Sequence, residues 1–502
     1  MKKTLSMILV IIVFLLTSCA ADMEVSPFPP ADGKNYNPNE LYYDNDKWET
    51  IGDNDALIEN DFIKTQTNPV STFSADVDTA SYTYFRKMVN SNYSFDYIKQ
   101  YGGKSLRTEE MINYFSYDTV EPVEGDMFGV KAVISDCMWN VENKMLMLTL
   151  KAKEVEIPPA GNNLVFLIDV SGSMDAPDKL DLLKKAFSYL VARLTEKDKV
   201  SIVTYSGREK VVLENCPGNQ TERIMDAINS LVASGSTNGE AGLKKAYKIA
   251  ESCFIQNGNN RIILASDGDL NVGMTSVEEI KEFVAEKRES GIYISVLGFG
   301  TGNYRDAKME TIADNGNGVY YYVDSESEVE KIFGSELVST LYTVAKDVKF
   351  QITFNPAIVK SYRLIGYENR MLNTEDFQDD KKDAGEVGSG HALTVCYELV
   401  LEESEDGDSN IANLAVRWKE PDSAESTLRE YKITTGNFTS DPGDDFKFVS
   451  AVIETAMLLH QSKHAGNSSF THIKSILEGI SLDDPYKEEF KSLITKLALY
   501  NH

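Results

Sequence analysis

The chain has 502 residues, of which 42% are hydrophobic, and it carries 78 acidic against 50 basic residues, for a formal net charge of −28 at pH 7. A charge this negative repels phosphate backbones and anionic lipid headgroups, so the composition argues against a protein that binds nucleic acid. The length fits about two to four domains, and the apolar content is ordinary for a globular protein.

The N-terminus has the features of an export signal. Lys2 and Lys3 precede an apolar run at 5–16, which is too short for a comfortable membrane-spanning helix. The sequence LTSC that follows resembles the bacterial lipobox, in which the cysteine is lipidated and becomes the new N-terminus. We therefore expect a signal peptide at 1–18 and lipidation of Cys19. The lipid would anchor the chain to the cell membrane or outer membrane, on the extracytoplasmic side.

The next stretches differ in composition. Residues 19–69 are rich in Asn, Asp and Pro and lack a periodic apolar pattern, so we expect a flexible tether there. The apolar spacing within 70–120 predicts a small helical segment. Within 121–160, leucines at alternate positions of 146–150 predict strands that form a hairpin.

Apolar strands alternate with amphipathic helical patterns from 161 to 336. We expect strands at 164–169, 199–206, 210–214, 261–266, 293–299 and 319–323, with helices between them. This alternation predicts an α/β domain with a doubly wound, mostly parallel sheet that helices cover on both faces. The strand at 210–214 follows its predecessor closely, which predicts an antiparallel hairpin at the sheet edge.

Strand patterns return in 337–440, and the pattern becomes helical in 441–502. We expect the strands before and after the α/β domain to form one β-sandwich. The α/β domain would then be an insertion in this sandwich, because the two ends of such a domain can lie close together.

Four cysteines besides Cys19 have no metal-binding spacing. An exported chain permits disulfides, but we expect buried free thiols as the default. The four are Cys137, Cys216, Cys253 and Cys396.

Oxygen-bearing side chains follow the strands of the predicted α/β domain. The motif DVSGS places Asp169, Ser171 and Ser173 after its first strand, Thr237 precedes a helix, and Asp267 follows a later strand. In a doubly wound sheet, ligands bind outside the carboxyl ends of the strands. These five hard oxygen ligands, without His or Cys, favour one Mg²⁺, Mn²⁺ or Ca²⁺ ion over zinc or copper.

This set of residues resembles the metal-ion-dependent adhesion site of von Willebrand factor A domains. The resemblance implies a Rossmann-like domain in which the five residues hold one ion, and an Asp or Glu of a protein partner completes its shell. The motifs STFSADVDTASY at 71–82, EEMINYF at 109–115 and GFGTGNYRD at 298–306 extend the likeness. They resemble the bacterial YfbK-like lipoproteins, over residues 70–502. The role of that family is poorly defined, so this resemblance implies architecture more than function.

Other motifs have simpler explanations. DVDTA at 76–80 resembles the loop of haloacid-dehalogenase phosphatases, but its fifth residue is alanine, and a helix start capped by Asp78 or Thr79 is favoured. His460 and His464 could share a helix face and hold zinc, but without a third ligand solvated surface histidines are favoured. The sequence contains neither GxxxxGK[ST] nor GxSxG, so it supports neither nucleotide binding nor a hydrolase.

The sequence therefore predicts a cell-envelope lipoprotein that binds a protein partner through a divalent cation, in adhesion or in assembly of a surface complex. The alternative is a structural envelope scaffold, in which the ion only stabilises the α/β domain and binding needs no metal. We do not expect an enzyme, because Ser173 has no candidate general base nearby in the sequence.

Overall fold

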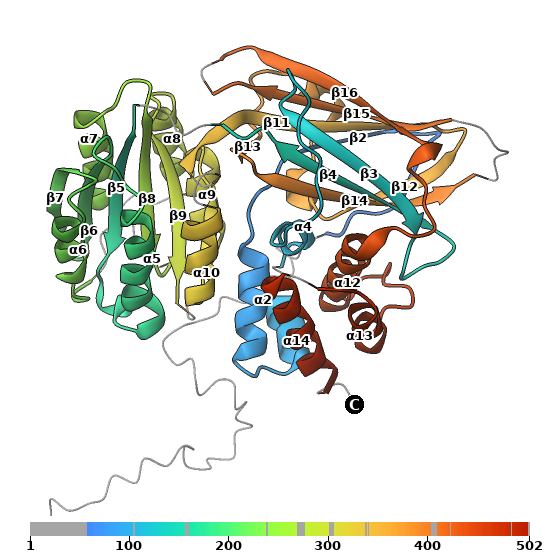
Figure 1. Cartoon of the computed structure of the whole chain (residues 1–502), viewed down its shortest axis with the longest axis horizontal. Coiled ribbons are helices and arrows are strands. Elements are labelled where there is room, and N and C mark those ends of the chain that lie inside the picture. The colour runs from blue at the N-terminus through green and yellow to red at the C-terminus, as the bar shows by residue number, and fades with distance from the viewer. Residues whose placement is uncertain are drawn as a thin grey trace, which may run out of the picture. The chain divides into compact units, whose positions relative to one another are not determined.

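A computed structural model describes residues 58–499, apart from 104–105, 156–159, 237–238, 269–276, 301–305, 337–338, 340, 403–408, 422 and 483. Cys19 and the signal peptide lie outside the described residues, and lipidation there stays a prediction. None of the helices in the described part combines the length and apolar character that a membrane crossing needs. Figure 1 shows an α/β domain joined to a two-sheet region with accompanying helices.

The α/β domain contains a six-stranded sheet in the order β10-β9-β8-β5-β6-β7. Its strands are β5 (Asn162–Asp169), β6 (Lys199–Tyr205), β7 (Glu209–Pro217), β8 (Asn259–Ser266), β9 (Tyr293–Phe299) and β10 (Tyr320–Val323). Neighbouring strands are parallel except for β6 and β7, which form the predicted antiparallel edge hairpin. The predicted doubly wound, mostly parallel sheet is confirmed.

Helices cover both faces of this sheet. They are α5 (Leu182–Val191), α6 (Thr221–Asn229), α7 (Gly239–Ser252), α8 (Val277–Arg288), α9 (Asp306–Asn315) and α10 (Glu326–Glu330). The central strand β5 is buried throughout, and its side chains alternate between the two faces. Leu164 and Phe166 pack in the core with α5 and α6, whereas Val165 and Leu167 pack in the core with α7, α8 and α9.

Strands from both sides of the α/β domain form the predicted β-sandwich. One sheet has the order β1-β12-β14-β4-β3; in the other, β13, β11, β15 and β16 follow one another and β2 also pairs with β11. Leu150 of β4, which precedes the α/β domain in the sequence, pairs with Leu393 of β14, which follows it. Phe73 and Phe350 from one sheet share a core with Leu150 and Tyr397 of the other. The strands are β1 (Ile63–Lys64), β2 (Val70–Ser74), β3 (Phe128–Asp136), β4 (Lys144–Ala152), β11 (Thr343–Phe354), β12 (Val359–Ile365), β13 (Gly385–Gly388), β14 (Ala392–Leu401), β15 (Asn410–Lys419) and β16 (Ser426–Thr434).

Two predicted boundaries are wrong. The tether was expected to extend over 19–69, but β1 lies within that range and pairs with β12. The segment 70–120 was expected to be helical, but it opens with β2, which pairs with β11 and places Phe73 opposite Phe350. Three of the five residues of β2 are Ser or Thr, so the sequence has no alternating apolar pattern here. The segment is a strand because it pairs with β11.

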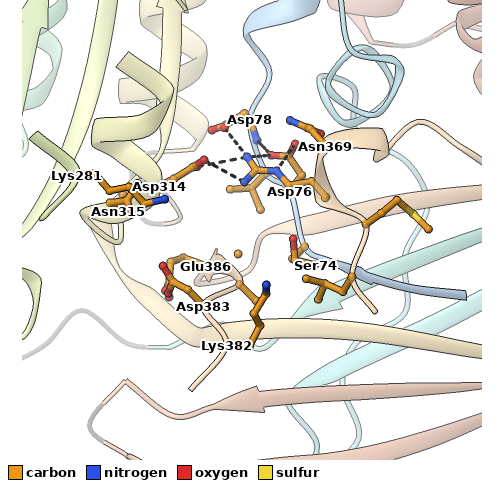
Figure 2. Close-up of a pocket in the computed structure, with 18 residues that line it drawn as sticks. Ser74, Asp76, Asp78, Lys281, Asp314, Asn315, Asn369, Lys382, Asp383 and Glu386 are labelled. Atoms are coloured by element: carbon orange, nitrogen blue, oxygen red, sulfur yellow. Dashed lines mark hydrogen bonds and ion pairs between the residues drawn. The ribbon is translucent and has the colours of Figure 1, made fainter. Parts of the chain in front are cut away.

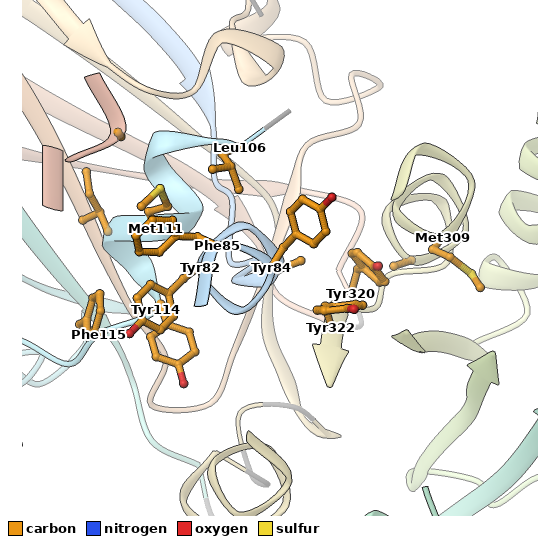
Figure 3. Packing of buried hydrophobic residues seen from close by; sticks show 14 of the residues in the cluster. Tyr82, Tyr84, Phe85, Leu106, Met111, Tyr114, Phe115, Met309, Tyr320 and Tyr322 are labelled. Atoms are coloured by element: carbon orange, nitrogen blue, oxygen red, sulfur yellow. The ribbon is translucent and has the colours of Figure 1, made fainter. Parts of the chain in front are cut away.

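Helices from the two ends of the chain share one core. The N-terminal ones are α2 (Ala80–Asn90), α3 (Phe95–Tyr97) and α4 (Thr108–Asn113), and the C-terminal ones are α12 (Gly443–His460), α13 (Phe470–Glu478) and α14 (Pro485–Leu499). Tyr82 of α2 lies 4.7 Å, between ring centroids, from Phe115, which in turn lies 4.8 Å from Phe448 of α12. Figure 3 shows Tyr82 with Phe115 on one side of α2 and Tyr84 facing Tyr322 of β10 on the other. Helix α2 thus packs between the helical core and the α/β domain.

The four cysteines predicted as free thiols are buried and unpaired. Two of them, Cys137 and Cys396, lie in the core that the helices form with the first sandwich sheet. Burial raises the pKa of both thiols well above the ordinary value, which makes them poor nucleophiles.

Candidate functional site

The motif DVSGS lies at the carboxyl end of the central strand, where the sequence placed it. Asp169 is the last residue of β5, and a short helical turn at Gly172–Met174 follows. Asp169 and Ser171 are buried, whereas Ser173 is exposed at the surface of the loop. A buried strand therefore delivers a carboxylate to the base of the site and a hydroxyl to its rim.

Hydrogen bonds draw the three side chains of the motif together. The Ser171 N–H donates to Asp169 Oδ1 at 2.8 Å, and the Ser266 hydroxyl of β8 donates to Asp169 Oδ2 at 3.3 Å. The Ser171 and Ser173 hydroxyl oxygens are 2.9 Å apart. The loop thus presents one carboxylate and two hydroxyls on the same side.

The loop that leads to Thr237 is bonded to this motif. The Ser234 N–H donates to the Val170 carbonyl at 2.7 Å, and the Gly172 N–H donates to the Gly235 carbonyl at 3.0 Å. Thr237 itself lies outside the described residues, so its part in the site stays a prediction. The bonded loop does bring the chain to the edge of the motif two residues before Thr237.

Asp267 follows β8 directly and is buried beside the motif. Burial raises the pKa of Asp169 to about 6, and the negative charge of Asp267 adds to this rise, while hydrogen bonds from Ser171 and Ser266 oppose it. The structure therefore brings together four of the five predicted ligands: Asp169, Ser171, Ser173 and Asp267.

Lys179 is a residue of this site that sequence reasoning missed. Its ammonium nitrogen donates to Asp267 Oδ2 at 3.0 Å and to the Ser173 carbonyl at 2.9 Å. It lies in the short helix η3 (Pro177–Asp181) that leads into α5. The sequence shows a lysine six residues after Ser173, but whether its side chain reaches the site depends on the path of the loop.

The donor set fits a hard divalent cation. Asp169 and Asp267 provide two carboxylates, and Ser171 and Ser173 provide hydroxyls, which are ligands of Mg²⁺, Mn²⁺ and Ca²⁺. Within the described ranges there is no group of three or more His, Cys, Asp or Glu side chains suited to a metal, and the described oxygens of this site are two carboxylates and two hydroxyls. Burial disfavours the charged form of the Asp169 carboxyl, and a bound cation would stabilise that charged form.

A polar cavity of about 300 Å³, away from this site, lies near the start of α2 and includes Asp76 and Asp78 of the DVDTA motif. Figure 2 shows the side chains of Asp76, Asp78 and Asp314 of α9 close together in this cavity. The Arg370 guanidinium pairs with all three, at 3.2 Å from Asp76, 3.5 Å from Asp78 and 3.1 Å from Asp314. The two aspartates of the motif are thus held by an arginine. This arrangement joins α9 of the α/β domain to the sandwich and gives no support to a phosphatase loop.

The predicted helix start after this motif is confirmed, because α2 begins at Ala80 with Thr79 as its N-cap residue, but the side-chain hydrogen bond expected of a cap is absent. Asp78 Oδ1 instead accepts from the Tyr320 N–H of β10 at 3.0 Å. Glu110 of α4 accepts a hydrogen bond from one backbone N–H in the first turn of α2: its Oε2 lies 2.8 Å from the Ser81 nitrogen.

The prediction of solvated surface histidines is wrong. His460 is partly buried, with Nε2 2.7 Å from the Leu106 carbonyl, and burial lowers its pKa. His464 packs edge-on against Phe62 at 5.4 Å between ring centroids. Because α12 ends at His460 and Gln461 is left-handed, the two histidines do not share a helix face.

Comparison with known proteins agrees with this architecture. A family model described as "Uncharacterized protein YfbK, C-terminal" matches residues 339–499. The model of the von Willebrand factor type A domain matches 163–335, and a model described as von Willebrand factor matches 51–147.

Similar proteins cover most of the chain or its central part. "Uncharacterized protein YfbK" of Escherichia coli K12 is 39% identical over 456 residues, which are 85% of this chain and 78% of that protein. Human inter-alpha-trypsin inhibitor heavy chain H3 is 25% identical over 272 residues, which are 50% of this chain and 30% of that protein. A solved von Willebrand factor type A structure from Catenulispora acidiphila has a TM-score of 0.44 at 16% identity, over 76% of this chain and 91% of that one. The chain therefore belongs to the family of YfbK, and its residues 163–335 form a von Willebrand factor type A domain.

Proposed function

We propose that this chain is a non-enzymatic binding protein of the cell envelope, whose α/β domain binds an aspartate or glutamate of a protein partner through one divalent cation. The von Willebrand factor A domain points to protein–protein adhesion or interaction. The observation that carries the proposal is the convergence of Asp169, Ser171 and Ser173 beside Asp267 at one edge of the sheet.

Each residue of the site has a distinct role in this proposal. Asp169 and Asp267 supply the negative charge that balances a divalent cation, and the Ser171 and Ser173 hydroxyls supply neutral oxygens. Thr237 would add a further hydroxyl from the adjoining loop. When bound, the cation supplies a Lewis-acidic position for a carboxylate oxygen of the partner. Mg²⁺ is the expected ion, with Mn²⁺ and Ca²⁺ as the alternatives.

The remaining features of the chain fit an anchored envelope protein. Lipidation of Cys19 would hold the folded part at the extracytoplasmic side of the cell membrane or outer membrane. The net charge of −28 disfavours nucleic acid as a partner, and no nucleotide site is proposed.

An affinity pull-down from envelope extract tests the proposal. The full chain would be used with Mg²⁺, with EDTA, and as the variant Asp169→Asn. The matched control is Asp175→Asn, because Asp175 is an exposed carboxylate of the same loop. We expect a partner band with Mg²⁺ for the wild-type chain and Asp175→Asn, and its loss with EDTA and with Asp169→Asn.

The alternative, an envelope scaffold whose ion is only structural, predicts a different result. The partner would then be retained in EDTA and by Asp169→Asn, while melting temperature would still respond to Mg²⁺ in the wild-type chain. That outcome would move the binding surface away from the cation site.

A further inference from the structure

The cation site contains a positive charge of its own. Lys179 donates to Asp267 Oδ2 at 3.0 Å and to the Ser173 carbonyl at 2.9 Å. Its side chain is 16% exposed and that of Asp267 is 3% exposed, so water screens this pair much less than an ordinary surface ion pair. The ammonium group thus neutralises one of the two carboxylates on which the proposed cation depends.

The stem of Lys179 lies in a slot that a glycine leaves open. Gly300, directly after β9, has φ +89, and a Cβ at this position would lie only 2.3 Å from Cε of Lys179. Both the backbone conformation and the space therefore suit glycine here. The slot directs the ammonium group toward Asp267.

Helix α2, from outside the α/β domain, holds the same two segments. Lys87 of α2 donates to the Gly300 carbonyl at 3.0 Å and to Asp178 Oδ2 at 3.1 Å. The Tyr322 hydroxyl also donates to the Gly300 carbonyl. Lys87 thus links the segment that carries Lys179 to the segment that forms its slot.

We propose that Lys179 is a tethered cation that competes with the divalent ion for Asp267, and that α2, through Lys87, holds it in the competing position. An ammonium group and a divalent cation repel each other at contact distance, so both cannot bind Asp267 Oδ2. Metal binding then requires Lys179 to leave its slot beside Gly300. The helical region at the chain ends thereby sets the affinity of the cation site. This inference rests on the proposed metal site.

Isothermal titration of Mg²⁺ into the full chain tests the competition. Lys179→Met keeps the stem and removes the charge, and we expect it to tighten Mg²⁺ binding about tenfold, or roughly 1.4 kcal/mol. Lys179→Arg keeps the charge and should bind Mg²⁺ as the wild type does. Lys87→Met should tighten binding by a smaller factor. The matched control is Lys185→Met on α5, because Lys185 forms an exposed ion pair with Glu326 and should leave affinity unchanged.

Thermal melting gives a second readout. Without the Lys179 charge, the Asp169–Asp267 pair lacks a cation in EDTA, so Lys179→Met should melt lower than wild type in EDTA and recover in Mg²⁺. Should Lys179→Met not fold, Lys179→Gln is the replacement, and the same increase in affinity is expected.

The outcomes separate this inference from the proposed function. If the wild type binds Mg²⁺ and Lys179→Met binds it equally or more weakly, the competition is wrong and the cation site stands. If Lys179→Met binds Mg²⁺ and the wild type does not, the competition is supported and the native chain works without metal. If no variant binds a divalent cation, both proposals fail.

Discussion

Glu109 tests how burial controls ionisation in the helical region. It lies in α4 and is fully buried. Burial raises its pKa from 4.5 to about 8, and the carboxyls of Glu368 and Asp76 add to the rise, while the Tyr367 backbone opposes it only in part. The folded chain therefore keeps a proton at neutral pH that the unfolded chain releases.

The size of the effect follows from this difference in pKa. A group that binds its proton more tightly when folded stabilises the fold fully below pH 4.5, and this stability is lost as the pH rises toward 8. At about 1.4 kcal/mol per pH unit, the loss between pH 4.5 and pH 7 is about 3 kcal/mol.

The substitution Glu109→Gln removes the ionisable group and keeps the shape of the side chain. We expect it to change the free energy of unfolding little at pH 4.5 and to raise it by up to about 3 kcal/mol at pH 7. Urea unfolding of the full chain, followed by circular dichroism at both pH values, measures this. The matched control is Glu214→Gln, an exposed glutamate of β7, which should be neutral at both. An equal loss of stability at pH 4.5 and pH 7 for Glu109→Gln would refute the reasoning.

Two further substitutions and one labelling experiment test the packing. Arg86 of α2 is buried and pairs with Asp324 and Glu328 of the α/β domain. Arg86→Met removes the partner of these carboxylates, so it should lower the free energy of unfolding in urea by about 3–5 kcal/mol. Arg429→Met breaks an exposed pair with Asp126 and should lower it by about 1 kcal/mol or less. Equal losses for the two variants would show that burial does not decide the strength of these pairs. The four buried thiols should react with Ellman's reagent only after unfolding, and fast labelling of any of these four in the native chain would show that a core opens.

The elements that the sequence predicted well are those with a strong local pattern. The strands of the α/β domain are apolar runs, and the Asp169–Ser173 motif has a fixed spacing after one of them, so both could be placed without tertiary information. By contrast, β2 is mostly Ser and Thr and becomes a strand only because β11 lies beside it. The residues of a strand alone do not specify which other strand it pairs with.

Charged contacts were the least predictable part of the site. Lys179 reaches Asp267 across 88 positions of sequence, and Lys87 reaches Gly300 across 213. Both depend on how a flexible side chain is directed by the loops and by α2. The capping of α2 by Glu110 rather than by Asp78 has the same cause, because a neighbouring helix supplied the acceptor.

The pairing of β4 with β14 has a consequence for the order in which the protein is made. The edge of β4 that binds β14 stays open until the whole α/β domain and the first part of the second sandwich half have been synthesised. During this interval the apolar hairpin of β3 and β4 must therefore be kept from aggregating. The inserted domain can fold meanwhile, since its sheet uses only its own strands. Its folding shortens the distance between the two sandwich halves and lowers the entropy cost of joining them.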